Sequence, residues 1–195
     1  SGVAGNNSGF TSNNAAAPEG AQVGFIQMGG QLSQKVTFAA GTYAITAKVA
    51  QRGGSYQTTA QTVNVYVDGT KVGAFCPAST SYTVATTNAF TVTAGVHTVL
   101  FQGSTTQDST LFLDALTLVS ATPPQAAEPL VKAAAVAAPA ATPAVVTVNG
   151  YGFESPKVGT ANFYAFAYNP TGTPWAFTGQ AGVAGNGSGF TDHSG

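Results

Sequence analysis

The end of this chain repeats its beginning. Residues 1–11 read SGVAGNNSGFT and residues 181–191 read AGVAGNGSGFT, so nine of eleven positions match at an offset of 180. A fold built from this chain must either find a place for both copies or leave one copy spare. Two origins explain such a repeat: a chain cut from a tandem array, or a module that starts mid-domain. In both cases we expect the natural domain boundary to lie away from Ser1.

The chain carries very little charge. Only 7% of its residues are charged and the net charge is −1, whereas an average soluble domain has about 25% charged residues. Nucleic-acid binding requires clustered Lys and Arg, which are absent from the sequence. No apolar run approaches the ~18 residues of a membrane-spanning helix, so membrane insertion is not expected. The single cysteine, Cys76, excludes an internal disulfide and is expected to be a buried, inert thiol.

Residues 22–120 show the alternation of short β-strands. Apolar and polar residues alternate along residues 43–49 and again along residues 62–67, a period of two that is typical of half-buried strands. Asp68-Gly69 predicts a tight hairpin, and Ala94-Gly95 predicts a second hairpin between residues 90–92 and 96–101. The most apolar stretch, 111–119, is expected to be a central strand. The pattern predicts an all-β sandwich.

Residues 121–144 interrupt this pattern. The segment is rich in Ala and Pro and contains no aromatic residue. Its prolines prevent a long continuous helix, so it is expected to be a semi-rigid linker. At about 3.1 Å per residue it would reach roughly 75 Å when extended. Strand character resumes at 145–180, with an opening strand expected in VVTVNGYGFESP and further strands in NFYAFAYNP and PWAFTG.

Several motifs acquire a familiar order when residues 145–195 are placed before residues 1–120. VNGYGFESP, PWAFTG and AGVAGNGSGF then precede APEGAQVGFIQ, the long strand that ends in AKVAQR, VNVYVDG and LFLDALTLV. In this order the sequence resembles galactose-binding-like jelly-roll domains. It is most similar to bacterial secreted domains related to the plant cell-wall domain-of-unknown-function 642 family. The resemblance covers nearly everything except the linker. It implies a jelly-roll β-sandwich, extracellular placement on a bacterial cell, and carbohydrate binding without catalysis.

The order in this chain departs from that family, because the opening strands come last. Residues 1–120 are therefore expected to form a sandwich body that lacks its first strands. Residues 145–195 are expected to supply them, with 181–195 repeating 1–15. Residues 145–180 would close the body of their own chain as a circular permutation, or dock into a neighbouring copy by strand exchange. A longer array is the third arrangement.

Catalytic patterns are missing from the sequence. The only histidines are His97, expected to face solvent, and His193, and neither a GxSxG elbow nor an HExxH motif occurs. Paired carboxylates for glycoside hydrolysis are not expected from acids scattered mostly in turns. The chain is therefore not expected to be an enzyme.

Two acids are candidate metal ligands. The resemblance implies that Glu154, in GFES, and Asp114, in LFLDAL, match acids that hold a structural Ca²⁺ in many galactose-binding-like modules. Calcium takes about six to eight oxygen ligands, many of them backbone carbonyls, so two acids can suffice. The alternative is that both carboxylates cap backbone groups. If calcium is bound, it would join the 145–195 segment to the body.

A sugar site needs aromatic platforms and planar polar side chains on loops. The loop QRGGSYQ offers these in Gln51, Arg52, Tyr56 and Gln57, and loop-like stretches later in the chain offer Tyr164 and Trp175. Arg52 would bind a hydroxyl or carboxylate with two hydrogen bonds, or pair with a local acid or carbonyl. Trp175 is either a platform or a core residue. Phe166 and Tyr168 also lie beside loops.

Two hypotheses of function follow. The first is a non-catalytic extracellular carbohydrate-binding module whose partner is a polysaccharide or other glycan. The alternative is a structural repeat whose copies assemble head-to-tail into surface fibres by donor-strand complementation. The terminal repeat, the displaced opening strands and the low charge, which reduces repulsion between packed subunits, motivate this alternative.

Overall fold

The protein is a β-sandwich of two sheets. The computed structural model describes residues 2–5, 14–55, 57–121, 146–159, 166–180 and 182–184. Within these residues all regular secondary structure is β-strand, as the sequence predicts. The larger sheet contains β1 (Gly2–Gly5), β2 (Gln22–Gln27), β4 (Gly41–Gln51), β7 (Thr83–Thr86), β8 (Phe90–Val92), β10 (Thr110–Ser120), β11 (Phe166–Tyr168) and β13 (Gly182–Ala184). The smaller sheet contains β3 (Gln31–Phe38), β5 (Val63–Val67), β6 (Thr70–Phe75), β9 (Gly95–Gly103) and β12 (Ala176–Thr178).

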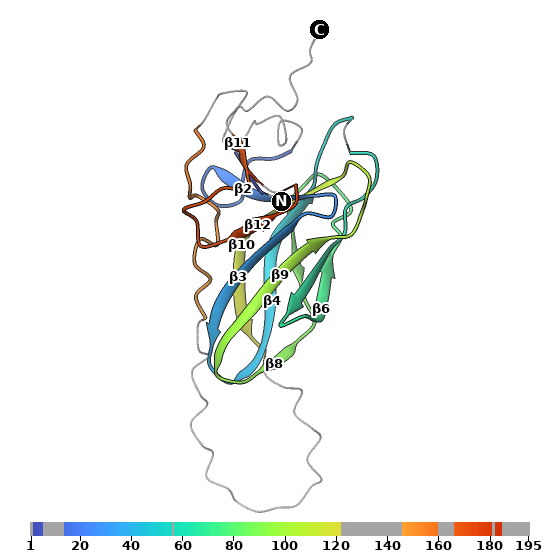
Figure 1. Ribbon diagram of the computed structural model, residues 1–195. Coiled ribbons are helices and arrows are strands. Elements are labelled where there is room, and N and C mark those ends of the chain that lie inside the picture. Colours follow the sequence, from blue (N-terminus) through green and yellow to red (C-terminus); the bar gives the residue numbers. More distant parts are fainter. Residues whose placement is uncertain are drawn as a thin grey trace, which may run out of the picture.

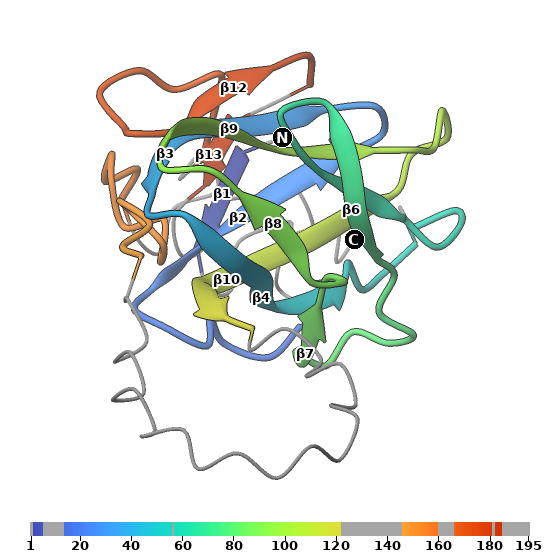
Figure 2. The same ribbon diagram turned by 90° about the horizontal axis from the view of Figure 1, so that it is seen from below.

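The strand order places sequence-distant segments side by side. The larger sheet runs β11-β13-β1-β2-β10-β4-β7, with β8 paired to β4, and the smaller sheet runs β12-β3-β9-β5-β6. Figure 1 shows the long strands of both sheets running along the molecule, and the view from below in Figure 2 separates the two layers. As predicted, the apolar stretch 111–119 is central, because β10 lies between β2 and β4.

The alternation seen in the sequence corresponds to burial. In β4, Tyr43, Ile45, Ala47 and Val49 are buried, while Lys48 is exposed. In β5, the three valines are buried and the residues between them are only partly covered. This confirms the period-of-two interpretation, since successive strand residues point to opposite faces.

One predicted hairpin is confirmed and the other is wrong. Asp68 and Gly69 both have positive φ, 47° and 79°, as a two-residue turn between β5 and β6 requires. Ala94-Gly95 does not form a hairpin. β8 pairs with β4 in the larger sheet and β9 pairs with β3 and β5 in the smaller one, so the chain crosses between sheets here. Gly95 has φ 145°, and a glycine accommodates this conformation most readily.

The described residues after the linker, 146–159, 166–180 and 182–184, are called the C-terminal segment. This segment contributes few strand residues but several core residues. Of the opening strand expected after residue 145, the described part contains only an isolated bridge between Val146 and Leu118. β12 extends the smaller sheet by pairing with β3, with Phe177 opposite Leu32. Phe153 and Trp175 are 1% and 3% exposed and belong to the main core between the sheets. Nearly all of the expected linker, residues 122–144, lies outside the described residues.

A glycine in β2 makes room for the C-terminal segment. A Cβ atom at Gly24 would lie 2.9–3.0 Å from the ring of Phe153, closer than real Cβ contacts. The Phe153 ring stacks on Trp175 with centroids 5.4 Å apart and an interplanar angle of 26°. Trp175 in turn contacts Phe101 of β9 edge-on at 6.2 Å. The pair therefore links β2 of one sheet to β9 of the other.

A second apolar cluster lies apart from the main core. Val23, Phe25 and Phe112 are fully buried and are covered by Ala17, Tyr82 and Phe166. Because Gly24 and Ile26 face the opposite side, β2 is buried on both faces. Cys76, expected to be buried, is instead exposed, one residue beyond the end of β6.

Replacing Phe153 by Ala tests whether the C-terminal segment is part of the core. Large-to-alanine changes in a core cost about 3–5 kcal/mol of unfolding free energy. We expect a loss in this range in urea or thermal unfolding, with a single cooperative transition. The matched control is Tyr151→Ala two residues earlier, where the side chain is 45% exposed and a much smaller effect is expected. Equal stability of Phe153→Ala and the wild type would contradict the packing described above.

Candidate functional site

Three carboxylates from distant parts of the chain gather on one side of the larger sheet. Asp114 lies in β10, Glu19 precedes β2, and Glu154 belongs to the C-terminal segment. The charges of both glutamates act on Asp114 and raise its pKa. The structure thus brings together Asp114 and Glu154, the two predicted metal ligands, and adds Glu19, which the sequence analysis missed. Three of the seven acids in the chain lie in this cluster, which we call the carboxylate cluster.

The carboxylates hold the backbone that leads into β2. Asp114 Oδ2 accepts a hydrogen bond from the Glu19 amide at 2.8 Å. Glu154 Oε1 accepts two more from the amides of Ala21 and Gln22, each at 2.8 Å. The Gln22 side chain returns a hydrogen bond to the carbonyl of Phe153 at 2.7 Å. Both acids therefore cap backbone groups, which is the alternative stated for them above.

Local backbone geometry creates the space for these side chains. β10 shifts register between Asp114 and Thr117, and Ala115 takes a positive φ of 49° there. This irregularity directs the Asp114 carboxyl group into a fully buried position. Glycines leave the remaining room: a Cβ at Gly152 would collide with the Glu19 carboxylate, and one at Gly20 with the Glu154 carboxylate.

The cluster is electrostatically unfavourable when all its acids are ionised. Burial raises the pKa of Asp114 to about 7, the amide hydrogen bonds from Glu19 and Ala115 oppose this rise, and the charges of Glu19 and Glu154 increase it. Burial, together with the charge of Asp114, also raises the pKa of Tyr82 well above its usual range. Glu19 Oε2 is buried and has no hydrogen-bond partner. A buried, unpaired carboxylate oxygen is costly, so a cation would stabilise this cluster.

The donor set fits calcium in kind. All three side chains offer carboxylate oxygens, the ligands that Ca²⁺ prefers. In the described parts of the chain, no three acidic, histidine or cysteine side chains are arranged so as to hold a metal ion by themselves. A bound calcium would therefore need backbone carbonyls or water as well. The orphaned oxygen of Glu19 is the observation that favours such a site.

The first residues of the predicted sugar-binding loop, 51–53, are buried, whereas Gly54 and Ser55 are exposed. Gln51 is 6% exposed, and its side-chain amide donates to the carbonyls of Gln61 and Pro77. Its Oε1 accepts hydrogen bonds from the Gln61 amide and from Gln57 Nε2. All four hydrogen-bonding positions of Gln51 are thus used within the chain, so Gln51 and Gln57 fasten neighbouring loops together.

The remaining predicted ligand residues lie in different environments. Trp175 is a core residue, so its ring is not a surface platform, and its Nε1 donates to the carbonyl of Gly150 at 2.9 Å. Arg52 is 3% exposed and lies close enough to Tyr168 for its charge to lower the pKa of that phenol. Tyr56 and Tyr164 lie outside the described residues.

A partly exposed tyrosine beside Arg52 is a better candidate. Tyr168, in β11, is 37% exposed, and its hydroxyl donates to Gln27 Oε1 at 3.1 Å. Gln27 Nε2 donates in turn to Asp108 Oδ1 at 2.5 Å. Burial raises the pKa of Tyr168 to about 12, an effect that Arg52 reduces and Asp108 increases. The ring also packs edge-on against Phe25 at 5.6 Å. We call Tyr168, Gln27, Asp108 and Arg52 the tyrosine cluster.

The tyrosine cluster was only partly visible in the sequence. Tyr168 stands out there merely as one of several aromatic residues beside loops. Gln27 ends β2 and Asp108 lies in a loop before β10, and no spacing rule joins either residue to Tyr168. β2–β10 pairing brings them together, because Thr110 lies opposite Gln27. The cluster thus presents one partly exposed aromatic ring and the partly exposed Asp108 carboxylate, while Gln27 and Arg52 are buried beneath them. An aromatic ring beside polar groups is typical of a sugar site.

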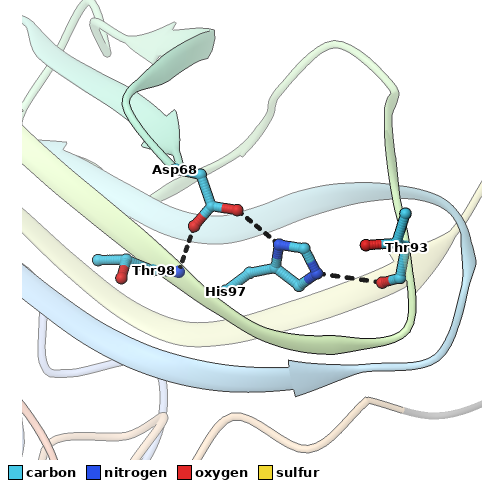
Figure 3. A network of polar contacts seen from close by, with 4 residues as sticks. All are labelled: Asp68, Thr93, His97 and Thr98. Atoms are coloured by element: carbon cyan, nitrogen blue, oxygen red, sulfur yellow. Dashed lines mark hydrogen bonds and ion pairs between the residues drawn. The ribbon is translucent and has the colours of Figure 1, made fainter.

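A separate polar network joins the strand ends around His97 (Figure 3). His97 Nδ1 lies 2.5 Å from Asp68 Oδ2, and Nε2 lies 3.0 Å from the carbonyl oxygen of Thr93. The other Asp68 oxygen accepts the Thr98 amide at 2.8 Å. A carbonyl and a carboxylate only accept hydrogen bonds, so both contacts are hydrogen bonds when His97 carries a proton on each ring nitrogen.

The network borders a hollow of about 320 Å³, lined also by Val67, Val72, Phe90 and Val92. The sequence analysis expected His97 to face solvent, but its side chain is only 12% exposed. Hydrogen bonding to Asp68 raises the pKa of His97. The pKa of Asp68 is lowered by the Thr98 amide and by His97. Their mutual attraction is therefore strongest between these two pKa values.

No protein-family model matches the chain, and no curated protein matches it. Solved structures with similar chains include the CBM36-1 domain of a multidomain xylanase from the hindgut metagenome of Trinervitermes trinervoides. It is 18% identical, with a TM-score of 0.43, and the match covers 56% of this chain and 84% of that one. A CBM36 module in complex with calcium and xylotriose is 20% identical over 54% and 85% of the two chains, with a TM-score of 0.40.

A third similar structure is TmCBM61 in complex with β-1,4-galactotriose. It is 16% identical, with a TM-score of 0.43, over 61% of this chain and 81% of that one. No helix of the described residues is long and apolar enough to cross a membrane. The strands and sheets of the described residues themselves define an all-β sandwich.

The carboxylate cluster predicts a particular dependence of stability on pH and calcium. The pKa of Asp114 rises from 3.8 to about 7 on folding, so the folded state binds more protons than the unfolded state between these values. Stability in EDTA should then fall as the pH rises from 3.8 to about 7 and level off above that range. Added calcium should raise the melting temperature at pH 7 and reduce this fall, because it binds only the folded state.

Glu154→Gln is the matched variant for this experiment. It keeps an oxygen to accept the amides of Ala21 and Gln22 but removes the negative charge, so the response to calcium should weaken. Melting curves of wild type and variant, recorded with EDTA and with calcium, provide the measurement. A wild-type melt that is the same in EDTA and in calcium would rule out the metal site.

The His97 network predicts a pH effect in the same direction, a loss of stability as the pH rises, but from a group that titrates at higher pH in the unfolded chain. A histidine whose pKa is raised by folding stabilises the protein below its unfolded pKa, and this contribution is lost as the pH rises through its folded pKa. His97→Gln should therefore lower the melting temperature most at about pH 5, and the difference from wild type should shrink as the pH rises towards about 8, across the range in which histidines titrate. A difference from wild type that is constant over this range would show that His97 acts through packing alone.

Proposed function

We propose that this protein is a non-catalytic, extracellular carbohydrate-binding module of a bacterial secreted or surface protein. The tyrosine cluster is its glycan site. Tyr168 offers a partly exposed ring, and the chain from Tyr168 through Gln27 to Asp108 holds this ring in one orientation. Pre-ordered side chains lower the entropic cost of binding. This hydrogen-bonded aromatic platform is the single observation that carries the proposal.

The polar members of the tyrosine cluster suit the hydroxyl groups of a sugar. Asp108 offers carboxylate oxygens, and Arg52 lies beside the phenol that it influences. The partly exposed Asp108 supplies acceptors next to an apolar ring, which suits the polar and apolar faces of a pyranose, while the buried Arg52 lies behind the ring. The sequence resemblance to secreted galactose-binding-like domains points to the same class of ligand and to extracellular placement.

The carboxylate cluster has a structural role in this proposal. Glu19, Asp114 and Glu154 would hold a calcium ion, which when bound supplies positive charge for the buried oxygens. The three residues connect the backbone before β2, strand β10 and the C-terminal segment. We expect the ion to support the sandwich rather than to contact the glycan, because none of these acids belongs to the tyrosine cluster.

Tyr168→Ala tests the glycan site. Binding to a panel of immobilised plant and bacterial polysaccharides identifies a ligand, and calorimetry then measures its affinity. We expect Tyr168→Ala to weaken binding about tenfold or more, equivalent to about 1.4 kcal/mol. Tyr168→Phe, which keeps the ring but loses the hydrogen bond to Gln27, should weaken it by a smaller factor. Tyr151→Ala, an exposed tyrosine outside the cluster, is the control. Glycan binding that survives Tyr168→Ala unchanged would place the site elsewhere, and no binding to any glycan would refute the function.

Assembly of copies into surface fibres is the second candidate function. It rests on a different observation, the duplicated strand at the two ends of the chain.

A further inference from the structure

The hollow beside His97 is bounded by strands of both sheets. The β5–β6 hairpin of the smaller sheet lines one side with residues 67–72, and β8 with the turn after it lines the other with residues 90–93. The volume of the hollow, about 320 Å³, is at the low end of the range for ligand pockets, about 300–1,000 Å³. It therefore suits one small molecule and not a chain of sugars.

The floor of the hollow is apolar, and its side chains are held in place by packing. Val67 and Val72 are buried. The ring of Phe90 contacts Phe38 edge-on with centroids 6.2 Å apart, and Phe38 contacts the His97 ring edge-on at 5.5 Å. These contacts fix the floor before a ligand arrives, which lowers the entropic cost of binding.

The rim of the hollow is polar, and its charged group is the carboxylate of Asp68, whose side chain is 53% exposed. One oxygen accepts the Thr98 amide and the other lies against His97 Nδ1 (Figure 3). A carboxylate offers about four acceptor positions, so these two contacts leave capacity for a donor on a ligand. The other exposed side chains of the rim are threonines: Thr70, Thr91 and Thr93.

The charges at the hollow disfavour an anion. Among the described residues that line it, Asp68 and His97 are the ionisable ones. Protonated His97 and ionised Asp68 neutralise each other, and once His97 loses its proton only the negative charge remains. Neither state attracts a negatively charged ligand. An uncharged molecule with a hydroxyl donor suits the Asp68 carboxylate in both states.

We propose that this hollow binds a small phenolic molecule, whose ring packs on the floor of Val72 and Phe90 and whose hydroxyl donates to Asp68. The polar groups lie on the rim, so one hydroxyl at one end of an apolar ring matches their placement. A monosaccharide carries hydroxyls around its whole edge. Those facing the apolar floor would lose their hydrogen bonds to water without replacement, which is costly.

The hollow and the tyrosine cluster lie at opposite ends of β10. Thr110, at the start of this strand, lies opposite Gln27 of the tyrosine cluster. Ser120, at its end, lies opposite Tyr43, which in turn pairs with Phe90 of the hollow. Phenol binding is therefore a property beyond the proposed glycan function, and either one can fail without the other.

A matched series of probes tests the class of ligand. Phenol, anisole and benzoate share one ring, but anisole has no donor and benzoate is an anion. The methyl resonances of Val67 and Val72 are followed by NMR during titration at about pH 7. We expect saturable shifts with phenol, and binding about tenfold weaker or more for anisole and benzoate, because each lacks the hydrogen bond to a charged acceptor.

Two outcomes of this titration would overturn the proposal. The first is the absence of saturable shifts with phenol, or equal affinities for the three probes. The second is glucose binding in the hollow more tightly than phenol, which would assign the wrong class of ligand. Tyr168→Ala should leave phenol binding unchanged, so the hollow is tested separately from the glycan site.

Two variants locate the binding in the hollow. Asp68→Asn keeps an oxygen for the Thr98 amide, and asparagine tolerates the positive φ of 47° at this position. It should weaken phenol binding about tenfold and leave anisole unaffected. Thr70→Trp places a large ring at the exposed rim and should abolish binding of both probes.

Thr106→Trp is the matched control for Thr70→Trp. Thr106 is also exposed, but it lies in the loop before β10, at the end of that strand away from the hollow. This variant should bind phenol as the wild type does, and urea unfolding checks that all variants are folded. Thr70→Trp decides the question even where Asp68→Asn does not fold. Phenol affinity that is equal in Thr70→Trp and Thr106→Trp would overturn the proposal.

Discussion

The stack of Phe153 on Trp175 is the contact on which the closed sandwich depends. It lies between the two sheets and is supplied by a segment that follows the body in sequence. Its position requires a glycine in β2, since a Cβ at Gly24 would enter the space of the Phe153 ring. Around this stack the Glu154 carboxylate fixes the backbone before β2, and β12 extends the smaller sheet. Core packing and the geometry of the carboxylate cluster therefore depend on the same docked segment.

The carboxylate cluster shows how a structural and a metal-binding interpretation can share the same residues. Burial and the charges of Glu19 and Glu154 favour protonation of Asp114, while amide hydrogen bonds favour its ionised form. Hydrogen bonds to backbone amides thus offset only part of the electrostatic cost. Glu19 has an oxygen that no protein group neutralises. Capping of backbone amides and calcium binding are compatible roles for this cluster.

Local sequence patterns predicted those parts of the fold that depend on local physics. Alternation in residues 43–49 and the Asp68-Gly69 turn follow from side-chain direction and backbone preference alone. Ala94-Gly95 has similar turn chemistry, yet the chain crosses to the other sheet there, because strand partners are chosen by packing at long range. For the candidate metal site, the resemblance to a family singled out Asp114 and Glu154, and the structure brings these two residues close together. Glu19, Gln27 and Asp108 were missed because only the folded topology brings them to their partners, and Gln51 was misplaced because its polar side chain gave no sign of burial.

The central place of β10 has a consequence for how the chain folds. β2 and β4 flank this strand, although β10 lies more than 80 positions after the start of β2 in the sequence. The larger sheet cannot assemble by adding successive hairpins, and its middle is completed only when both flanking strands find a late partner. Sheets with such non-local pairing fold slowly, because loop closure must precede the stabilising contacts. Completion of the core comes later still in a chain made from its N-terminus, because Phe153 and Trp175 follow β10 in the sequence.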